Sequence, residues 1–97
     1  MATRFEWDPD KAAANVRKHG VSFDVARFAF ADPFALIEQD RIEGGEQRWQ
    51  TLGMVNGVVM LLVAHTLRDE GEIEVIRIIS ARPATRPERK RYEQEAR

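Results

Sequence analysis

The dipeptide Asn56-Gly57 stands between two segments rich in strand-forming residues, and it constrains the fold more than any other short stretch. Asn-Gly favours the two-residue turn whose backbone twist matches that of paired strands. The flanking segments, residues 46–55 and 58–68, are therefore predicted to form an antiparallel hairpin. Residues 58–64 are apolar throughout, which indicates a strand buried on both faces in the middle of a sheet.

Further strands on both sides extend this hairpin into a meander. Residues 34–41 are predicted to form a strand that returns through the turn at residues 43–46. On the other side, Asp69-Glu70-Gly71 turns the chain into a last strand, residues 72–82. Because consecutive strands joined by short turns usually pair with each other, we expect a mainly antiparallel sheet.

Two helices are predicted between a short N-terminal strand and this meander. Residues 3–7 alternate polar and apolar side chains, which is typical of a strand. A first helix is predicted over residues 9–19, with Asp8 as its N-cap and Gly20 as its left-handed end. A second helix is expected over residues 22–30.

Both helices carry apolar residues at helical spacing, which predicts faces packed on the sheet. In the first helix the expected face holds Ala12, Val16 and His19, with Asn15 between them. The second helix is apolar over most of its surface. All of these residues are interpreted as core: Phe23, Val25, Ala26, Phe28, Ala29 and Phe30.

An arginine-bearing strand leads into a basic C-terminal helix, predicted over residues 87–96. The stretch from 76 to 92 has a local charge of about +5, although the chain as a whole has a net charge of -1. Arginine presents a planar donor fork that matches phosphate oxygens. The order of elements predicts an α+β fold with two N-terminal helices and one C-terminal helix.

Length and composition narrow the class of protein. The 97 residues suffice for one core of a sheet and a few helices, so residues 1–97 are expected to form a single domain. The chain has no cysteine, which excludes disulfides, thiolate catalysis and cysteine-based zinc sites. No apolar run is long enough to span a bilayer, and the N-terminus has no signal core. We therefore expect a cytoplasmic protein with no membrane partner.

Motifs in a fixed order cover nearly the whole chain, and their ordered combination is distinctive although no single motif is. They are Phe5-Glu6-Trp7-Asp8-Pro9-Asp10-Lys11-Ala12, Asn15 with Lys18-His19-Gly20-Val21-Ser22-Phe23, Asp32-Pro33, Gly45-Glu46-Gln47-Arg48-Trp49 with Gly53, His65-Thr66 with Arg68, and Ile78-Ile79-Ser80-Ala81-Arg82 with Ala84, Glu88-Arg89 and Tyr92. In this order they resemble the BrnT toxins of bacterial type II toxin–antitoxin pairs.

The resemblance implies a RelE-like fold, in which helices cover one side of a twisted, mainly antiparallel sheet and the other side is open and basic. It implies an endoribonuclease that needs no metal or other cofactor and inhibits translation by cutting RNA. It also implies a BrnA-like antitoxin with a ribbon-helix-helix DNA-binding part. The toxin would then associate with DNA only as part of the complex with the antitoxin.

Metal-free RNA cleavage needs a base for the ribose 2′-hydroxyl, cations for the phosphorane-like transition state and an acid for the leaving oxygen. Its products are a 2′,3′-cyclic phosphate and a 5′-hydroxyl. The residues whose chemistry suits these roles are Lys18, His19, Glu46, Arg48 and Arg82. Arg82 is the strongest candidate, because it ends its strand just before Pro83.

Four of the five candidates also have an ordinary structural explanation. Lys18 and His19 suit the C-terminal end of a helix dipole. Glu46 and Arg48 suit a solvated strand face with a cross-strand ion pair. His65 is interpreted as a core histidine, and it is only a reserve candidate for the catalytic site.

A wider RNA-binding surface is predicted from further arginines: Arg68, Arg77, Arg86 and Arg89. Arg77 suits either a buried ion pair or a phosphate ligand. The arginines of the last helix suit a solvated face or the docking of an acidic antitoxin segment equally well. Tyr92 is expected to pin the last helix to the sheet.

Two other functions remain open at this stage. The same basic end would serve a non-catalytic module that binds RNA or a partner, with salt-sensitive binding and no new RNA termini. The chain would also fit a purely structural role in a DNA-binding autorepressor complex.

Overall fold

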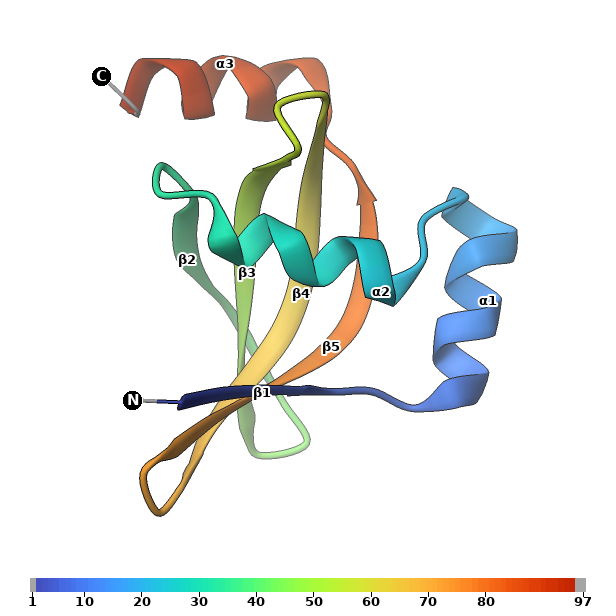
Figure 1. The fold of residues 1–97 in the computed structure, drawn as a ribbon, viewed down its shortest axis with the longest axis vertical. Coiled ribbons are helices and arrows are strands. Elements are labelled where there is room, and N and C mark those ends of the chain that lie inside the picture. Colours follow the sequence, from blue (N-terminus) through green and yellow to red (C-terminus); the bar gives the residue numbers. More distant parts are fainter. Residues whose placement is uncertain (1, 96–97) are drawn as a thin grey trace.

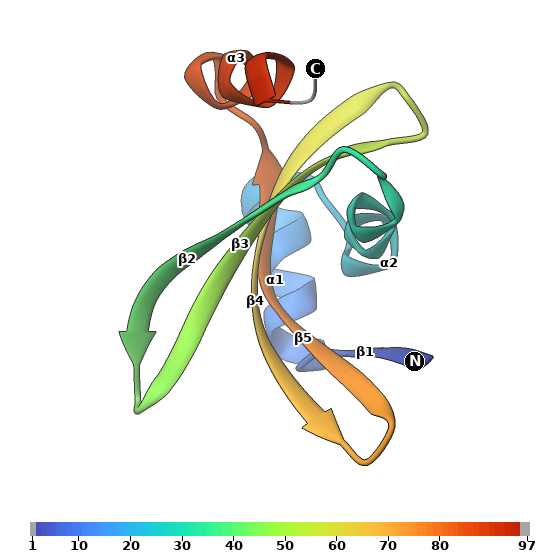
Figure 2. The same cartoon turned by 90° about the vertical axis from the view of Figure 1, so that its left-hand side faces the viewer.

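A strongly twisted five-stranded sheet carries the other elements of the fold (Figures 1 and 2). The computed structural model describes residues 2–95. The strands are β1 (Ala2–Glu6), β2 (Leu36–Glu43), β3 (Glu46–Val55), β4 (Val59–Glu70) and β5 (Ile73–Pro83). Their order across the sheet is β1-β5-β4-β3-β2.

The helical elements are α1 (Pro9–His19), α2 (Phe23–Ala26), the 3-10 helix η1 (Arg27–Ala31) and α3 (Arg86–Glu95). The predicted α+β class and the predicted order of elements are therefore confirmed. The segment expected as one second helix is instead a short α-helix that tightens into a 3-10 helix.

The sheet is mixed, because one of its pairs is parallel. The strands β2, β3, β4 and β5 form the expected antiparallel meander. The turn at Asn56-Gly57 has positive φ at both residues, as the sequence predicts. The strand β1, in contrast, pairs parallel with β5 from Ala2↔Ile73 to Glu6↔Arg77. No local turn motif in the sequence predicts a pairing between strands so far apart in the chain.

The helices α1, α2 and η1 cover one face of the sheet, and η1 lies directly on β3. A Cβ atom on Gly53 would lie 2.4 Å from the carbonyl oxygen of Ala29. The residues of α2 and η1 that face the sheet, Phe23, Ala26 and Ala29, are spaced by three and are essentially inaccessible to solvent. This spacing matches the 3-10 period, in which residues i and i+3 lie on the same side.

Because only that narrow stripe is buried, the prediction that the whole apolar surface is core is wrong for two residues. Val25 is 44% exposed and Phe28 is 46% exposed. A segment this short has only one side against the sheet, so apolar residues between the buried positions face solvent.

The helix α1 is attached to β5 through Asn15. Its side-chain amide donates to the carbonyl oxygens of Val21 (2.9 Å) and Ala81 (2.8 Å), and its side-chain oxygen accepts from Ala81 N–H (3.1 Å). Asn15 thus satisfies the part of the β5 edge that β1 leaves unpaired. The predicted apolar face of α1 is wrong at Val16, which is 47% exposed, because the polar Asn15 takes the buried position.

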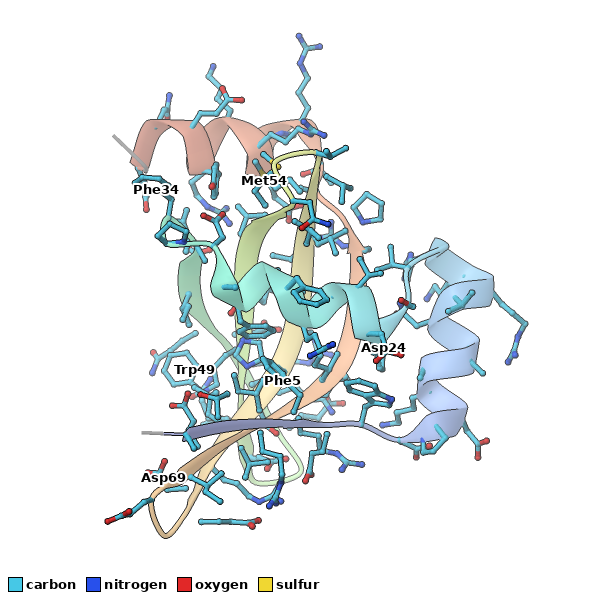
Figure 3. All side chains as sticks on the ribbon, viewed as in Figure 1. Phe5, Asp24, Phe34, Trp49, Met54 and Asp69 are labelled. Atoms are coloured by element: carbon cyan, nitrogen blue, oxygen red, sulfur yellow. The ribbon has the colours of Figure 1, made fainter. Side chains whose placement is uncertain are left out.

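The helix α3 packs against the opposite face, at one end of the sheet (Figure 2). Tyr92 joins Leu52, Met60 and Leu62 in a second apolar cluster. Met54, which is labelled in Figure 3, packs against this cluster. The Tyr92 hydroxyl donates to Asp32 at 2.5 Å. Burial, reinforced by this hydrogen bond, raises the pKa of Tyr92 to about 12. Tyr92 therefore pins α3 to the sheet.

A β-bulge in β5 decides which way its last residues point. Ala64 pairs with Ser80 but His65 pairs with Ile78, so Ile79 is an extra residue in β5. Before the bulge, Ile76 and Ile78 lie in the core beneath the helices, and after it Ala81 does. Strict alternation from Ile78 would have turned Arg82 toward the helices. The extra residue turns Arg82 to the opposite face.

Candidate functional site

Arginines from three strands line one hollow on the face opposite α1, α2 and η1. Arg41 comes from β2, Arg48 from β3 and Arg82 from β5, and the hollow has a volume of about 170 Å³. The remaining lining residues are Asp40, Gln50, Leu62, Ala64, Ile79 and Ser80. We call this the arginine hollow. Of the five predicted catalytic residues, it brings together Arg48 and Arg82.

Arg82 is paired and still accessible. Its guanidinium makes a two-pronged contact with the Glu88 carboxylate, with nitrogen–oxygen distances of 2.8 and 2.9 Å. The Arg82 hydrogen bonds hold the pKa of Glu88 at about 2, and Glu88 in turn raises the pKa of Arg82. The Arg82 side chain remains 36% exposed. The ion pair therefore fixes the group without sealing it from the hollow.

Arg48 lies deeper than Arg82, with 22% of its side chain exposed. It pairs with Glu43 at 3.0 Å, and Arg41 contacts the same carboxylate at 3.1 Å. Two guanidinium groups thus share one carboxylate at the β2–β3 turn. Asp40 also lines this end of the hollow, so two carboxylates balance the charge of the two arginines there.

Arg68 and Arg77 lie on the same sheet face but belong to a separate ion-pair network. Arg68 binds both oxygens of Glu6 (2.9 and 3.0 Å), and Arg77 binds one of them (3.0 Å). The Arg68 hydrogen bonds, with help from Arg77, lower the pKa of Glu6 to about 2 despite some desolvation. Glu70 contacts Arg68 and also Arg4. Arg77 therefore forms an ion pair, but not the buried one that was predicted, because 42% of its side chain is exposed.

Three of the predicted catalytic residues are not among those lining the arginine hollow. Lys18 and His19 end α1, which packs against β5 from the helix-covered side, while Arg82 points to the other side. Glu46 is exposed at the start of β3 and shares the face of Arg48, two residues away. It lies beyond the rim rather than inside the hollow.

The arginines of α3 differ in their surroundings. Arg86 and Arg89 are exposed at the N-terminal half of the helix. Arg91 reaches across to β2 and pairs with Glu38 at 2.7 Å. The helix α3 is therefore held to β5 by the Glu88–Arg82 ion pair and to β2 by the Arg91–Glu38 ion pair.

His65 is a core residue, as the sequence analysis expects. Its ring is inaccessible to solvent, its Nε2 lies 2.7 Å from the Thr51 hydroxyl, and Phe30 contacts it edge-on with ring centroids 4.8 Å apart. Burial lowers the pKa of His65 to about 4. The side chain is thus neutral at physiological pH.

Five residues at the site were not predicted from the sequence as site residues: Asp40, Arg41, Gln50, Ser80 and Glu88, which is the partner of Arg82. Asp40 and Arg41 occupy an irregular part of β2, where the register shifts between Gln39 and Ile42. Alternation fails at such a shift, so no periodic signal places these residues. Glu88 could have been found from the Thr85-x-x-Glu88 spacing, which is that of a helix capping box.

Fold and hollow together define the class: a small α+β protein whose mixed sheet presents guanidinium groups, suited to anions, on its open face. Residues 7–88 match the family described as the ribonuclease toxin, BrnT, of type II toxin–antitoxin systems. The chain belongs to this BrnT family, and membership of a type II system implies an antitoxin partner.

A solved relative has the same fold. The crystal structure of the Brucella abortus ribonuclease toxin BrnT aligns with a TM-score of 0.64 and 23% sequence identity, covering 89% of this chain and 100% of that one. A search of curated protein sequences finds no match. None of the helices within residues 2–95 combines the length and apolar character needed to cross a bilayer.

Proposed function

We propose that this chain is a metal-independent endoribonuclease, RelE-like in fold, that cuts RNA at the open sheet face and thereby inhibits translation. The observation that carries the proposal is that Arg48 and Arg82, far apart in sequence, line one hollow on that face. The family description supports the ribonuclease activity. The hollow adds a place where a phosphate would meet cationic groups.

Arg48 and Arg82 lie toward different ends of the hollow. Arg82 pairs with Leu62, and Leu62 pairs with Leu52 on β3. Arg48 lies four residues from Leu52, which corresponds to about 13 Å along the strand, and β3 lies about 10 Å across the sheet from β5. Arg48 is held by Glu43 and Arg82 by Glu88. We therefore propose that Arg48 exchanges Glu43 for RNA when one phosphate is bound by both arginines. In the proposed mechanism they stabilise the phosphorane-like transition state after attack by the 2′-hydroxyl.

The proton transfers require a base and an acid near that phosphate. Glu46 is one candidate, because it follows the same strand face about 7 Å beyond Arg48. Asp40 is a second carboxylate and lines the hollow itself, where its Oδ2 accepts from Gln50 at 3.3 Å. Lys18 and His19 remain candidates, which RNA would reach only by passing around the edge of β5 that Asn15 occupies.

The RNA chain would extend beyond the hollow along the arginines of the same face. Arg86 and Arg89 are exposed and available for phosphates. Arg68 and Arg77 would have to exchange their carboxylate partners for RNA, so we propose that they contribute less. The antitoxin is proposed to be BrnA-like, with a ribbon-helix-helix part through which the complex binds and represses its own promoter.

An RNA-cleavage assay with end-group analysis tests the proposal. The purified chain should cut single-stranded RNA in the presence of EDTA and leave 2′,3′-cyclic phosphate and 5′-hydroxyl ends. Cleavage that stops in EDTA and returns with a divalent cation would refute the metal-independent mechanism. Salt-sensitive RNA binding without new termini would instead indicate a non-catalytic binding module.

A further inference from the structure

The contact between Arg82 and Glu88 belongs to a larger arrangement at the start of α3. Glu88 Oε1 also accepts the backbone N–H of Thr85 at 2.8 Å, and the Thr85 hydroxyl accepts the Glu88 N–H at 3.4 Å. This reciprocal pattern is a capping box, with Thr85 as N-cap and Glu88 at the third helical position. One carboxylate therefore serves the helix end and the arginine together.

The orientation of the Arg82 guanidinium follows from its donor count. Arginine has five N–H donors in a rigid plane. Nη1 donates to Glu88 Oε1 and to the carbonyl oxygen of Pro83 (3.2 Å), and Nη2 donates to Glu88 Oε2. The Nε hydrogen and the second Nη2 hydrogen have no hydrogen-bond partner among residues 2–95. They lie side by side on one edge of the plane, which makes a second fork.

We infer that Glu88 is a positioning residue for RNA cleavage, which fixes Arg82 so that its free Nε–Nη2 fork is presented to a phosphate in the arginine hollow. The inference rests on the proposed ribonuclease function. Glu88 itself would not touch the RNA. Its carboxylate is largely buried, with 15% of the side chain exposed, and it is held on the adjacent Nη1–Nη2 edge of the guanidinium.

An opposite role for Glu88 is conceivable and predicts the opposite result. A carboxylate that merely neutralised Arg82 would compete with RNA, so removing its charge would strengthen RNA binding and accelerate cleavage. A positioning carboxylate lowers the positive potential around Arg82, but it holds the Nε–Nη2 fork in the orientation that binds phosphate. A misplacement of about 1 Å can reduce turnover by as much as about 100-fold.

The Glu88→Gln variant separates these roles, because glutamine is accepted at this position of a capping box but lacks the second acceptor oxygen that the two-pronged contact with Arg82 needs. We expect kcat for RNA cleavage to fall about 10- to 100-fold, with KM changed less than about threefold. The helical circular dichroism should stay close to that of the parent, whereas the urea midpoint should fall, because glutamine loses the ion pair with Arg82. An unchanged or increased kcat would overturn the inference.

A double-variant comparison checks that Glu88 acts through Arg82. Arg82→Lys keeps the charge and lacks the fork, so adding Glu88→Gln to Arg82→Lys should reduce kcat by much less than it does in the parent. An equal reduction in both backgrounds would mean that Glu88 acts elsewhere, and the inference would fail.

A spectroscopic measurement distinguishes failure of this inference from failure of the proposed function. Two-pronged binding slows guanidinium rotation, so ¹⁵N-labelled parent protein should show resolved Arg82 Nη–H signals that average in Glu88→Gln. This readout needs no RNA. Resolved signals in a chain that does not cut RNA would refute the function and keep the positioning. Averaged signals in the parent would refute the positioning even if RNA is cut.

Discussion

Protonation of His65 is expected to destabilise the fold well before its carboxylates titrate. The pKa of His65 falls from an ordinary 6.5 to about 4 because the ring is buried. A histidine with a lowered folded pKa binds its proton more tightly in the unfolded chain. The fold therefore has its full stability with respect to His65 above pH 6.5. It loses stability as the pH falls toward 4, because the unfolded chain binds the proton first.

The magnitude follows from the size of that shift. A difference of about 2.5 pKa units corresponds to about 3 kcal/mol in total. About 2 kcal/mol of this should disappear between pH 7 and pH 5. Glu6 and Glu88, whose folded pKa values are about 2, lose their contributions only below their ordinary value of 4.5. The interval from pH 7 to pH 5 thus isolates the histidine.

Urea unfolding at a series of pH values measures this effect. The free energy of unfolding of the parent should fall by about 2 kcal/mol from pH 7 to pH 5, and in His65→Gln most of this slope should vanish. His19→Gln is the matched control, since His19 lies at the end of α1 outside the core, and it should retain the slope. A parent whose stability changes by less than about 0.5 kcal/mol over this interval would refute the reasoning.

Three further substitutions and one matched control test the site and its scaffold. Arg82→Ala should reduce RNA cleavage by at least about 100-fold while circular dichroism stays unchanged. Arg27→Ala, which removes an equal charge from the helix-covered side, should leave the rate within about threefold, and equal losses would contradict the role of the hollow. Asn15→Asp, which loses both amide donors to Val21 and Ala81, should cost about 2–4 kcal/mol in urea unfolding, and a cost below about 0.5 kcal/mol would contradict the edge contact. Gly53→Ala should cost about 1–3 kcal/mol by crowding the Ala29 carbonyl, and a neutral result would mean that η1 shifts freely.

Local signals predicted much of the fold because the structures they specify are local. Asp8 caps α1 through its side chain, and Gly20 ends it with φ 71, as expected from their residue types. The Asn56-Gly57 turn forms because those residues tolerate positive φ. Each of these features depends on interactions within a few residues.

The candidate site was only partly predictable. Residue chemistry selected Arg48 and Arg82, and the structure brings them into one hollow. The same chemistry selected Lys18 and His19, which lie behind β5 on the helix-covered side. Donor and acceptor chemistry can be recognised from a side chain, but the face it occupies depends on packing.

The sequence by itself determined the turns, the helix ends, the succession of strands and the family. Only the tertiary structure decided that β1 joins β5 in parallel, that Asn15 occupies the edge of β5, and that Ile79 forms a bulge. The bulge turns Arg82 to the open face. Its physical reason is the register of β5 against β4, and a register is set by hydrogen bonds and packing between strands rather than by the residues of one strand alone.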